Sequence, residues 1–335
     1  MRDLPTIGIT MGDPSGIGPE IIRKALTDRD IHEICRPVVF GDAGAILEAP
    51  GGHSDLVIRE ITSPQEAEGS PGHIDILPLS ELNAKDRAPG KPSSAGGKAM
   101  VSFILQAVAS ALKGDIAGMV TGPISKVLMQ EAGYAFEGHT QLIAQLTHAE
   151  EYVMMLAGDR LRVCLATIHC ALKDVPNLLE LNGVYRTIAV TARALRVDFG
   201  IPSPRLAVAA LNPHAGEAGL FGREEEDIII PAVTRARNEG FEVEGPFPAD
   251  TLFFKAASGG FDAVIAMYHD QGLIPLKLLH FSDAVNVTLG LPIVRTSVDH
   301  GTAYDIAGKG KADPSSLKAA VRMAVRMAEN RRKSI

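Results

Sequence analysis

The sequence has few cysteines, no excess of positive charge and no long uninterrupted apolar run. Only three cysteines occur among its 335 residues, Cys35, Cys164 and Cys170, and none forms a CxxC pair. An odd number without that spacing argues against a disulfide framework and a cysteine zinc knuckle, and it favours a reducing compartment. The net charge of -7 leaves no positive excess for a nucleic-acid backbone or an anionic membrane surface.

A secretory signal is also lacking, because Pro5, Gly8, Gly12 and Pro14 interrupt the N-terminal region. The most apolar helical run, 99–112, is too short for a bilayer, which needs about 20 residues. Its flanking and internal polar residues recur every three or four positions, which is typical of a mostly buried helix in a core or a subunit interface. We therefore expect a cytoplasmic protein without a membrane or nucleic-acid partner.

The common nucleotide-binding fingerprints are missing as well. TMGDPSGIGPE contains only Gly16 and Gly18 at close spacing, so neither GxGxxG nor GxxxxGK[ST] is present. The segment still reads as a strand, a glycine turn and a helix that begins near Pro19, which can present backbone N–H groups to an anion. A plain tight turn is an equally good interpretation.

Apolar β-branched runs alternate with helical patterns along most of the chain, which predicts an α/β protein. At this length two domains are expected. The predicted strands are 6–10, 37–40, 116–121, 152–156, 161–168, 205–211, 262–267 and 284–288. The predicted helices are 19–27, 98–113, 141–147, 183–197, 223–238 and 314–330. The stretch 50–97, rich in Gly, Pro and Ser, is interpreted as long surface connections around short strands.

Three histidines each stand just beyond a predicted strand: His169 after LRVCLATI, His214 after RLAVAALNP and His269 after DAVIAMY. Ligands of open α/β sheets bind at the carboxyl ends of strands, so three imidazoles there can converge on one point. Three protein nitrogens around a divalent ion leave one coordination position open, as in a catalytic metal site. The alternative is three unrelated hydrogen-bonded histidines at strand ends.

Further polar residues follow these histidines or precede a helical pattern. Those after the third histidine are Asp270, Lys277, Asn286 and Arg295. Lys277 and Arg295 are candidates for binding a carboxylate or phosphate group, with surface solvation as the alternative. In the GHT segment, Thr140 is either a helix N-cap or, with His139, part of a substrate site.

Motifs spread over nearly the whole chain resemble the 4-hydroxythreonine-4-phosphate dehydrogenase family. They are TMGDPSGIGPE, TGPISK, GHTQ, ATIHCALKDVP, LNPHAGEAG, PFPADTLF, AMYHDQGL, NVTLGLPIVRTSVDHGTA and AGKGKAD. DPSGIGPE and DHGTAYDIAGKG are also similar to segments of isocitrate and 3-isopropylmalate dehydrogenases, which bind their cofactor without GxGxxG.

The resemblance implies roles for individual residues. The implied metal ligands are His169, His214 and His269, and the implied substrate-binding residues are His139, Thr140, Lys277, Asn286 and Arg295. The implied cofactor-binding residues are Gly16, Gly18, His300, Gly301, Thr302 and Ala303. The general base is not assigned, and its candidates, by position only, are Asp250, Asp270 and Lys277.

The resemblance also implies an architecture. Two α/β domains with a cleft between them, like those of isocitrate and isopropylmalate dehydrogenases, are expected at 1–130 plus about 304–335 and at 131–303. The second domain is expected to carry the metal histidines and the interface of a homodimer with shared active sites. In that dimer, His269 is expected to come from the subunit opposite His169 and His214.

The implied reaction uses NAD or NADP and one divalent ion per site, zinc, cobalt or magnesium. It oxidises the 3-hydroxyl of 4-phosphonooxy-L-threonine and releases CO2 to give 3-amino-2-oxopropyl phosphate, in pyridoxal 5'-phosphate biosynthesis. One alternative is a dehydrogenase of D-threonate or D-erythronate 4-phosphate. Another is a non-catalytic relative that keeps a metal and phosphate pocket.

Overall fold

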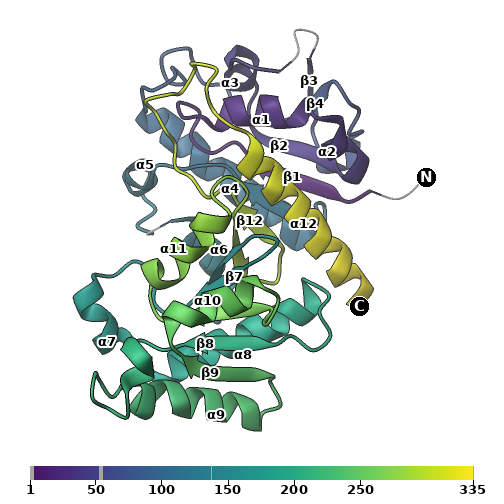
Figure 1. Cartoon of the computed structure of the whole chain (residues 1–335). Coiled ribbons are helices and arrows are strands. Elements are labelled where there is room, and N and C mark those ends of the chain that lie inside the picture. The colour runs from purple at the N-terminus through teal and green to yellow at the C-terminus, as the bar shows by residue number, and fades with distance from the viewer. Residues whose placement is uncertain (1–3, 53–55, 137, 335) are drawn as a thin grey trace. The chain divides into compact units, whose positions relative to one another are not determined.

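The computed structural model describes residues 4–52, 56–136 and 138–334, and the chain divides into two compact units (Figure 1). Unit 1 comprises Met1–Ala149 and Leu291–Lys333, and unit 2 comprises mainly Glu150–Gly290. Each unit is built of strands and helices that alternate along the chain, which confirms the α/β class. The segments 131–149 and 291–303, expected in the second domain, belong to unit 1.

Unit 1 contains a parallel sheet with the strand order β3-β4-β2-β1-β5-β12. Its strands are β1 (Thr6–Thr10), β2 (Arg36–Asp42), β3 (Val57–Glu60), β4 (His73–Ser80), β5 (Gly118–Thr121) and β12 (Arg295–Ser297). Its helices are α1 (Gly18–Leu26), α2 (Arg29–Ile34), α3 (Ala43–Glu48), the short η1 (Pro64–Glu66), α4 (Ser94–Lys113), α5 (Lys126–Glu131), α6 (His139–Leu146) and α12 (Ser315–Ser334). The pairing of β12 with β5 explains why residues after 290 return to this unit.

Helix α4 is the long apolar helix that the sequence predicted. The Ser93 hydroxyl accepts the N–H of Gly96 at its start, and Gly114, with φ 80°, ends it in the left-handed conformation. By length and composition α4 alone among the described helices could cross a membrane, but 56% of its apolar window is buried inside the protein. It packs on β1, β2 and β5, which confirms the prediction of a core helix.

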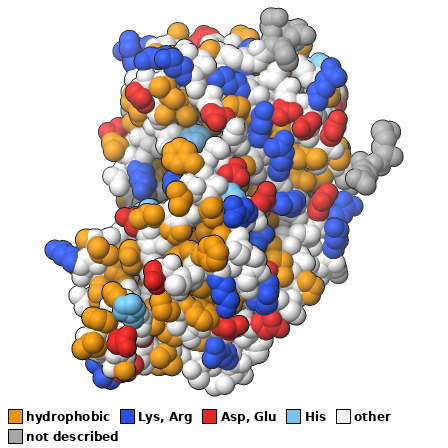
Figure 2. All heavy atoms as spheres, viewed as in Figure 1, with side chains coloured by type: hydrophobic (Ala, Val, Ile, Leu, Met, Phe, Trp, Pro, Cys, Tyr) orange, Lys and Arg blue, Asp and Glu red, His pale blue; other side chains and the backbone are white. Residues whose placement is uncertain are grey.

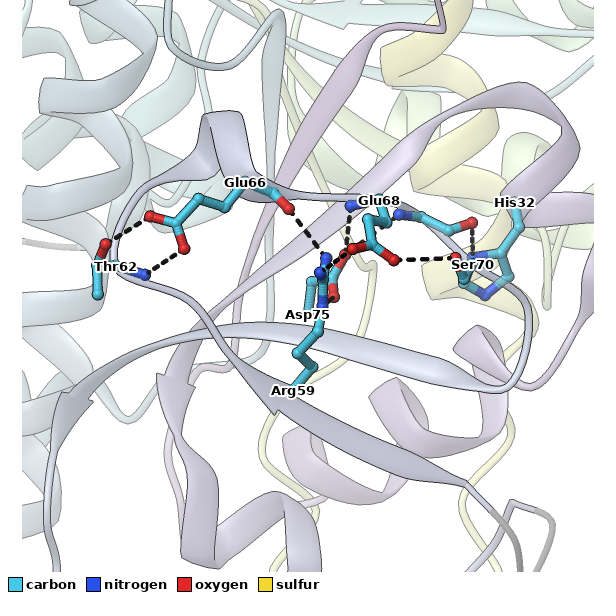
Figure 3. Close-up of polar contacts among 8 residues, drawn as sticks. His32, Arg59, Thr62, Glu66, Glu68, Ser70 and Asp75 are labelled. Carbon is cyan, nitrogen blue, oxygen red and sulfur yellow. Dashed lines mark hydrogen bonds and ion pairs between the residues drawn. The ribbon is translucent and has the colours of Figure 1, made fainter.

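The stretch 50–97 contains two short strands among its connections, as the sequence predicted. Strands β3 and β4 pair in parallel, and β4 is buried from Ile74 to Leu77. Figure 3 shows Arg59 of β3 directed at Asp75 of β4, and Asp75 also accepts the N–H groups of Glu68 and Gly69. The sequence did not locate these two strands, because the segment is rich in Gly, Pro and Ser.

Unit 2 contains a mixed sheet with the strand order β11-β6-β7-β10-β8-β9. Its strands are β6 (Val153–Ala157), β7 (Arg162–Leu165), β8 (Leu206–Ala209), β9 (Val243–Phe247), β10 (Ala263–Ala266) and β11 (Val285–Leu289). Its helices are η2 (Leu172–Asp174), α7 (Val175–Leu178), α8 (Leu181–Val197), the π-helical turn η4 (Glu225–Ile229), α9 (Ile230–Asn238), α10 (Ala249–Ala257) and α11 (His269–Leu279), with the irregular turn η3 (Pro213–Gly216).

Strands β7, β10, β8 and β9 run parallel, so their carboxyl ends share one edge of the sheet. Strands β11 and β6 are antiparallel to their neighbours. Helix α11 packs closely on this sheet at Gly272, where a Cβ atom would lie 2.4 Å from a methyl group of Val163. The sequence did not predict α10 and α11, because each is short and follows a strand without a strong helical period.

Candidate functional site

Each of the three candidate metal histidines follows a parallel strand of unit 2, as the sequence predicted. His169 follows β7, His214 follows β8, and His269 is the first residue of α11, the helix that follows β10. Strand β10 lies between β7 and β8, so all three histidines stand at one edge of the sheet.

Two of these histidines lie together within one chain. The ring centroids of His169 and His269 are 5.7 Å apart. His269 Nδ1 lies 2.7 Å from the Asp270 carboxylate, and a proton held there leaves Nε2 as a lone-pair donor for a metal ion. His214 instead faces the Phe221 ring at 6.1 Å. Within residues 4–52, 56–136 and 138–334, no three His, Cys, Asp or Glu side chains form a group that could hold an ion.

Two polar side chains connect the strand ends that carry these histidines. The Thr167 hydroxyl donates to the Met267 carbonyl oxygen at 2.7 Å, linking β7 to β10. The buried amide of Gln271 accepts the Met267 N–H and donates to the Ala210 carbonyl oxygen, linking β10 to β8. Sequence reasoning missed Gln271, although a buried glutamine needs such partners and its place in HDQG could have indicated it.

In unit 1, Arg295 and His139 form a pair suited to an anion. Arg295 opens β12, is 2% exposed and donates to the Thr121 hydroxyl at 2.8 Å. Burial lowers the pKa of its guanidinium to about 9. Burial, and then the charge of Arg295, hold the pKa of His139 well below its ordinary value. Among the described residues, His139 Nε2 is buried without a hydrogen-bond partner, so it can bind a polar group of a ligand.

The other candidate substrate residues are distributed differently. Thr140 is the second residue of α6, whose N-cap is Gly138, so the N-cap interpretation of Thr140 is wrong. Lys277 lies in the last turn of α11 and Asn286 on β11, both half-buried in unit 2. Within unit 1 the structure brings together His139 and Arg295, and it adds Thr121, which the TGPISK motif could have indicated.

The general-base candidates differ in their surroundings. Asp250 is exposed in the first turn of α10. Asp270 is engaged with His269, which suits a carboxylate that orients a ligand.

The candidate cofactor residues meet in unit 1. The Ile17 N–H donates to the Thr302 carbonyl oxygen at 3.0 Å, and the Tyr304 hydroxyl donates to the Asp13 carboxylate. Burial raises the pKa of Asp13 although Tyr304 and the Ser15 N–H both donate to it. The pKa of Tyr304 is raised to about 12 by burial and by Asp13.

Packing explains the two glycines of this cluster. A Cβ atom on Gly16 would lie 3.0 Å from the Thr302 carbonyl oxygen, and one on Gly18 would lie 2.0 Å from that of Met11. Both are therefore needed where backbones approach closely, as the tight-turn interpretation expects. The buried Nε2 of His300 has no hydrogen-bond partner in the part of the chain that the structure describes, and it is available to a ligand.

Known proteins match nearly the whole chain. The family model of the pyridoxal phosphate biosynthetic protein PdxA matches residues 33–324. A 4-hydroxythreonine-4-phosphate dehydrogenase of Desulforapulum autotrophicum is 54% identical over 96% of this chain and 94% of its own length. A D-threonate 4-phosphate dehydrogenase of Cupriavidus necator is 46% identical over 98% of both. The crystal structure of a 4-hydroxythreonine-4-phosphate dehydrogenase from Klebsiella pneumoniae is similar with a TM-score of 0.88 and 42% identity, covering 97% of this chain and 98% of that one.

Proposed function

Because the chain belongs to the PdxA family of pyridoxal phosphate biosynthetic proteins, an oxidoreductase family, we propose that it oxidises 4-phosphonooxy-L-threonine. The 3-hydroxyl becomes a ketone as hydride passes to NAD or NADP. Loss of CO2 then gives 3-amino-2-oxopropyl phosphate.

The observation that carries the substrate class is the buried guanidinium of Arg295. Burial lowers the pKa of this cation, and its planar guanidinium presents N–H donors in the geometry that a phosphate or carboxylate group accepts. The neutral His139 beside it supplies a hydrogen bond without adding a second positive charge. Thr140, Lys277 and Asn286 are proposed as further substrate contacts.

We propose that the histidines of unit 2 hold a divalent ion. His169 and His269 present two imidazoles to one region, and Asp270 fixes the ring of His269. His214 is the proposed third ligand. When bound, zinc, cobalt or magnesium supplies Lewis-acid chemistry at the substrate hydroxyl. Asp250, Asp270 and Lys277 stay candidates for the base that takes the hydroxyl proton.

A homodimer with shared sites is supported by the surface of unit 2. Figure 2 shows hydrophobic side chains gathered over α10 and α11. Phe254, Leu278 and Phe281 are 80%, 86% and 85% exposed. Large apolar side chains exposed close together mark a protein contact. A second copy that covers them would also bring a third metal ligand to the pair His169 and His269.

For the cofactor, we propose that Gly16, Gly18 and His300–Ala303 surround the nicotinamide dinucleotide, with His300 Nε2 available to it. The three cysteines are free, which suits a cytoplasmic location.

Steady-state rates with three substrates test this function. We expect NADH or NADPH formation to be fastest with 4-phosphonooxy-L-threonine, compared with D-threonate and D-erythronate 4-phosphates. A preference for either D-acid would establish the alternative dehydrogenase, for which the 46% identical relative is the precedent. No reduction of cofactor with any of the three would instead support a non-catalytic relative.

Metal removal tests the proposed ion separately. We expect a chelator to abolish cofactor reduction, and zinc or cobalt to restore it, because imidazole ligands suit these ions. Full activity of protein verified to be metal-free would contradict the metal site.

A further inference from the structure

The loop that carries His214 adopts a strained backbone. Six consecutive residues from His214 to Gly219 have positive φ, namely 52°, 55°, 82°, 45°, 53° and 87°. The Glu217 N–H donates to the His214 carbonyl oxygen, and the Leu220 N–H donates to that of Glu217. This is a short left-handed helical turn, and four of its six residues carry a Cβ atom that disfavours it. Such a conformation persists only where surrounding contacts impose it.

A buried carboxylate holds the segment that leads into this turn. Glu225 is 1% exposed and accepts the N–H groups of Leu211 and Asn212 at 2.8 and 2.7 Å. Its second oxygen accepts the Asn212 side-chain amide at 2.9 Å. Glu225 is the first residue of the π-helical turn η4, a geometry that is rare and frequent at functional sites. Three hydrogen bonds therefore fix the two residues that lead into Pro213 and His214.

Two glycines of the same loop make room for neighbouring side chains, and one of these side chains is Glu225. A Cβ atom on Gly216 would lie 2.7 Å from Glu225 Oε2. A Cβ atom on Gly222 would lie 2.4 Å from a carboxylate oxygen of Glu224 and 2.5 Å from the amide of Asn212. Gly216 thus brings the loop close to the Glu225 carboxylate, and Gly222 brings it close to Glu224 and to Asn212, the residue that Glu225 binds.

We propose that Glu225 is a positioning residue, which holds the left-handed turn 214–219 so that His214 is presented to the divalent ion. This inference rests on the proposed metal site. Without the carboxylate, two partly buried backbone N–H groups lose their acceptor, and the turn can relax and carry the imidazole away. Glu225 itself does not need to touch the ion or the substrate.

Cobalt binding to the metal-stripped full-length protein tests the proposal, with Co²⁺ titrated by visible absorption and calorimetry. We expect Glu225→Ala to raise the cobalt Kd about 10- to 100-fold, as loss of a residue that orients a ligand commonly does. Glu225→Gln should have a smaller effect, because one amide oxygen can still accept the backbone N–H groups. The matched control is Glu226→Ala, the next carboxylate of the same turn, which pairs with exposed Arg223 and should bind cobalt like the wild type.

A double-mutant cycle separates positioning from general damage. In a His214→Ala background, Glu225→Ala should weaken cobalt binding by less than about twofold further, because both changes act through one imidazole. Equal weakening in both backgrounds would overturn the positioning role, as would wild-type affinity in both Glu225 variants. If Glu225→Ala does not fold, the same double-mutant cycle is measured with Glu225→Gln in its place. If the His214→Ala variant binds cobalt with wild-type affinity, His214 is not a metal ligand, and the positioning role of Glu225 is refuted with it.

Discussion

His139 and Arg295 determine the electrostatics of the candidate anion site at the scale of single residues. Burial is the largest cause that lowers the pKa of both side chains, and the charge of Arg295 lowers that of His139 further. At neutral pH the pair therefore consists of a neutral imidazole beside a buried cation. A guanidinium suits a phosphate or carboxylate group of a ligand, which can accept two parallel N–H bonds from it.

The depressed pKa of His139 predicts a pH dependence of stability. Below pH 6.5, the ordinary pKa of histidine, His139 binds a proton in the unfolded chain but stays neutral in the folded chain. The contribution of His139 is therefore fully present above pH 6.5 and is lost as the pH falls toward the folded-state pKa. We expect His139→Gln to become more stable relative to the wild type as the pH falls from about 7.5 to about 5, measured by urea unfolding. If the unfolding free energies of the variant and the wild type differ by the same amount across that pH range, the lowered pKa of His139 is contradicted.

Arg295→Ala should damage use of the phosphorylated substrate far more than use of the cofactor. Loss of one partner of a buried charge pair commonly costs about 2–5 kcal/mol, so kcat/KM for the substrate should fall roughly 30-fold or more. Arg295→Lys is the companion variant, because it keeps the charge but loses the planar fork. Equal losses for substrate and cofactor, accompanied by a lower unfolding midpoint, would indicate misfolding instead.

At the scale of elements, two loops of unit 1 are joined where the candidate cofactor residues lie. The loop after β1 and the loop after β12 are linked by the bond from Ile17 to Thr302 and by the bond from Tyr304 to Asp13. Helix α1 is fixed to the second loop as well, because the buried carboxylate of Glu20 accepts the N–H of Ala312.

Tyr304→Phe tests that link. It leaves the buried carboxyl group of Asp13 with one hydrogen-bond donor fewer, which should destabilise the protein by about 1–3 kcal/mol. We expect the KM for NAD or NADP to rise more than the KM for the substrate. Tyr185→Phe is the matched control, because Tyr185 donates to Glu239 on the exposed surface of unit 2. Thermal unfolding and initial rates report both effects, and identical behaviour of the two variants would argue against the link.

At the scale of the whole molecule, the contact between His169 and His269 bears on how a dimer would divide its metal ligands. The sequence-based expectation separated these two histidines between subunits, whereas their rings lie 5.7 Å apart in one chain. This proximity favours a division in which one subunit provides His169 and His269 and the other provides His214.

Subunit mixing distinguishes the two divisions. We expect His214→Ala refolded with His269→Ala, each inactive alone, to recover roughly a quarter of wild-type activity, since half the dimers are mixed and each has one intact site. The mixture of His169→Ala with His269→Ala should recover none. Recovery of activity in the second mixture would support the division that the resemblance implied, in which His269 comes from the subunit opposite His169 and His214. No recovery in either, with exchange of subunits confirmed, would mean that one chain supplies all three ligands.

The sequence by itself determined the α/β class, the central strands and the strand-end positions of the three histidines. These features depend on local apolar runs and on the rule that parallel strands end at one edge, so they can be inferred without coordinates. The family motifs identified the candidate residues for the same reason, because each lies within a short contiguous segment.

Only the tertiary structure decided which of these residues meet. Three contacts join segments that no local sequence pattern relates. They are the hydrogen bond of Arg295 to Thr121, the ring contact of His169 with His269, and the bonds of Glu225 to Leu211 and Asn212. Glu225 stands in the run REEED, whose composition suggests a solvated helix start, and burial alone distinguishes it from its neighbours. Burial and close approach are properties of the folded chain, and they set the pKa values and the backbone strain on which the candidate site depends.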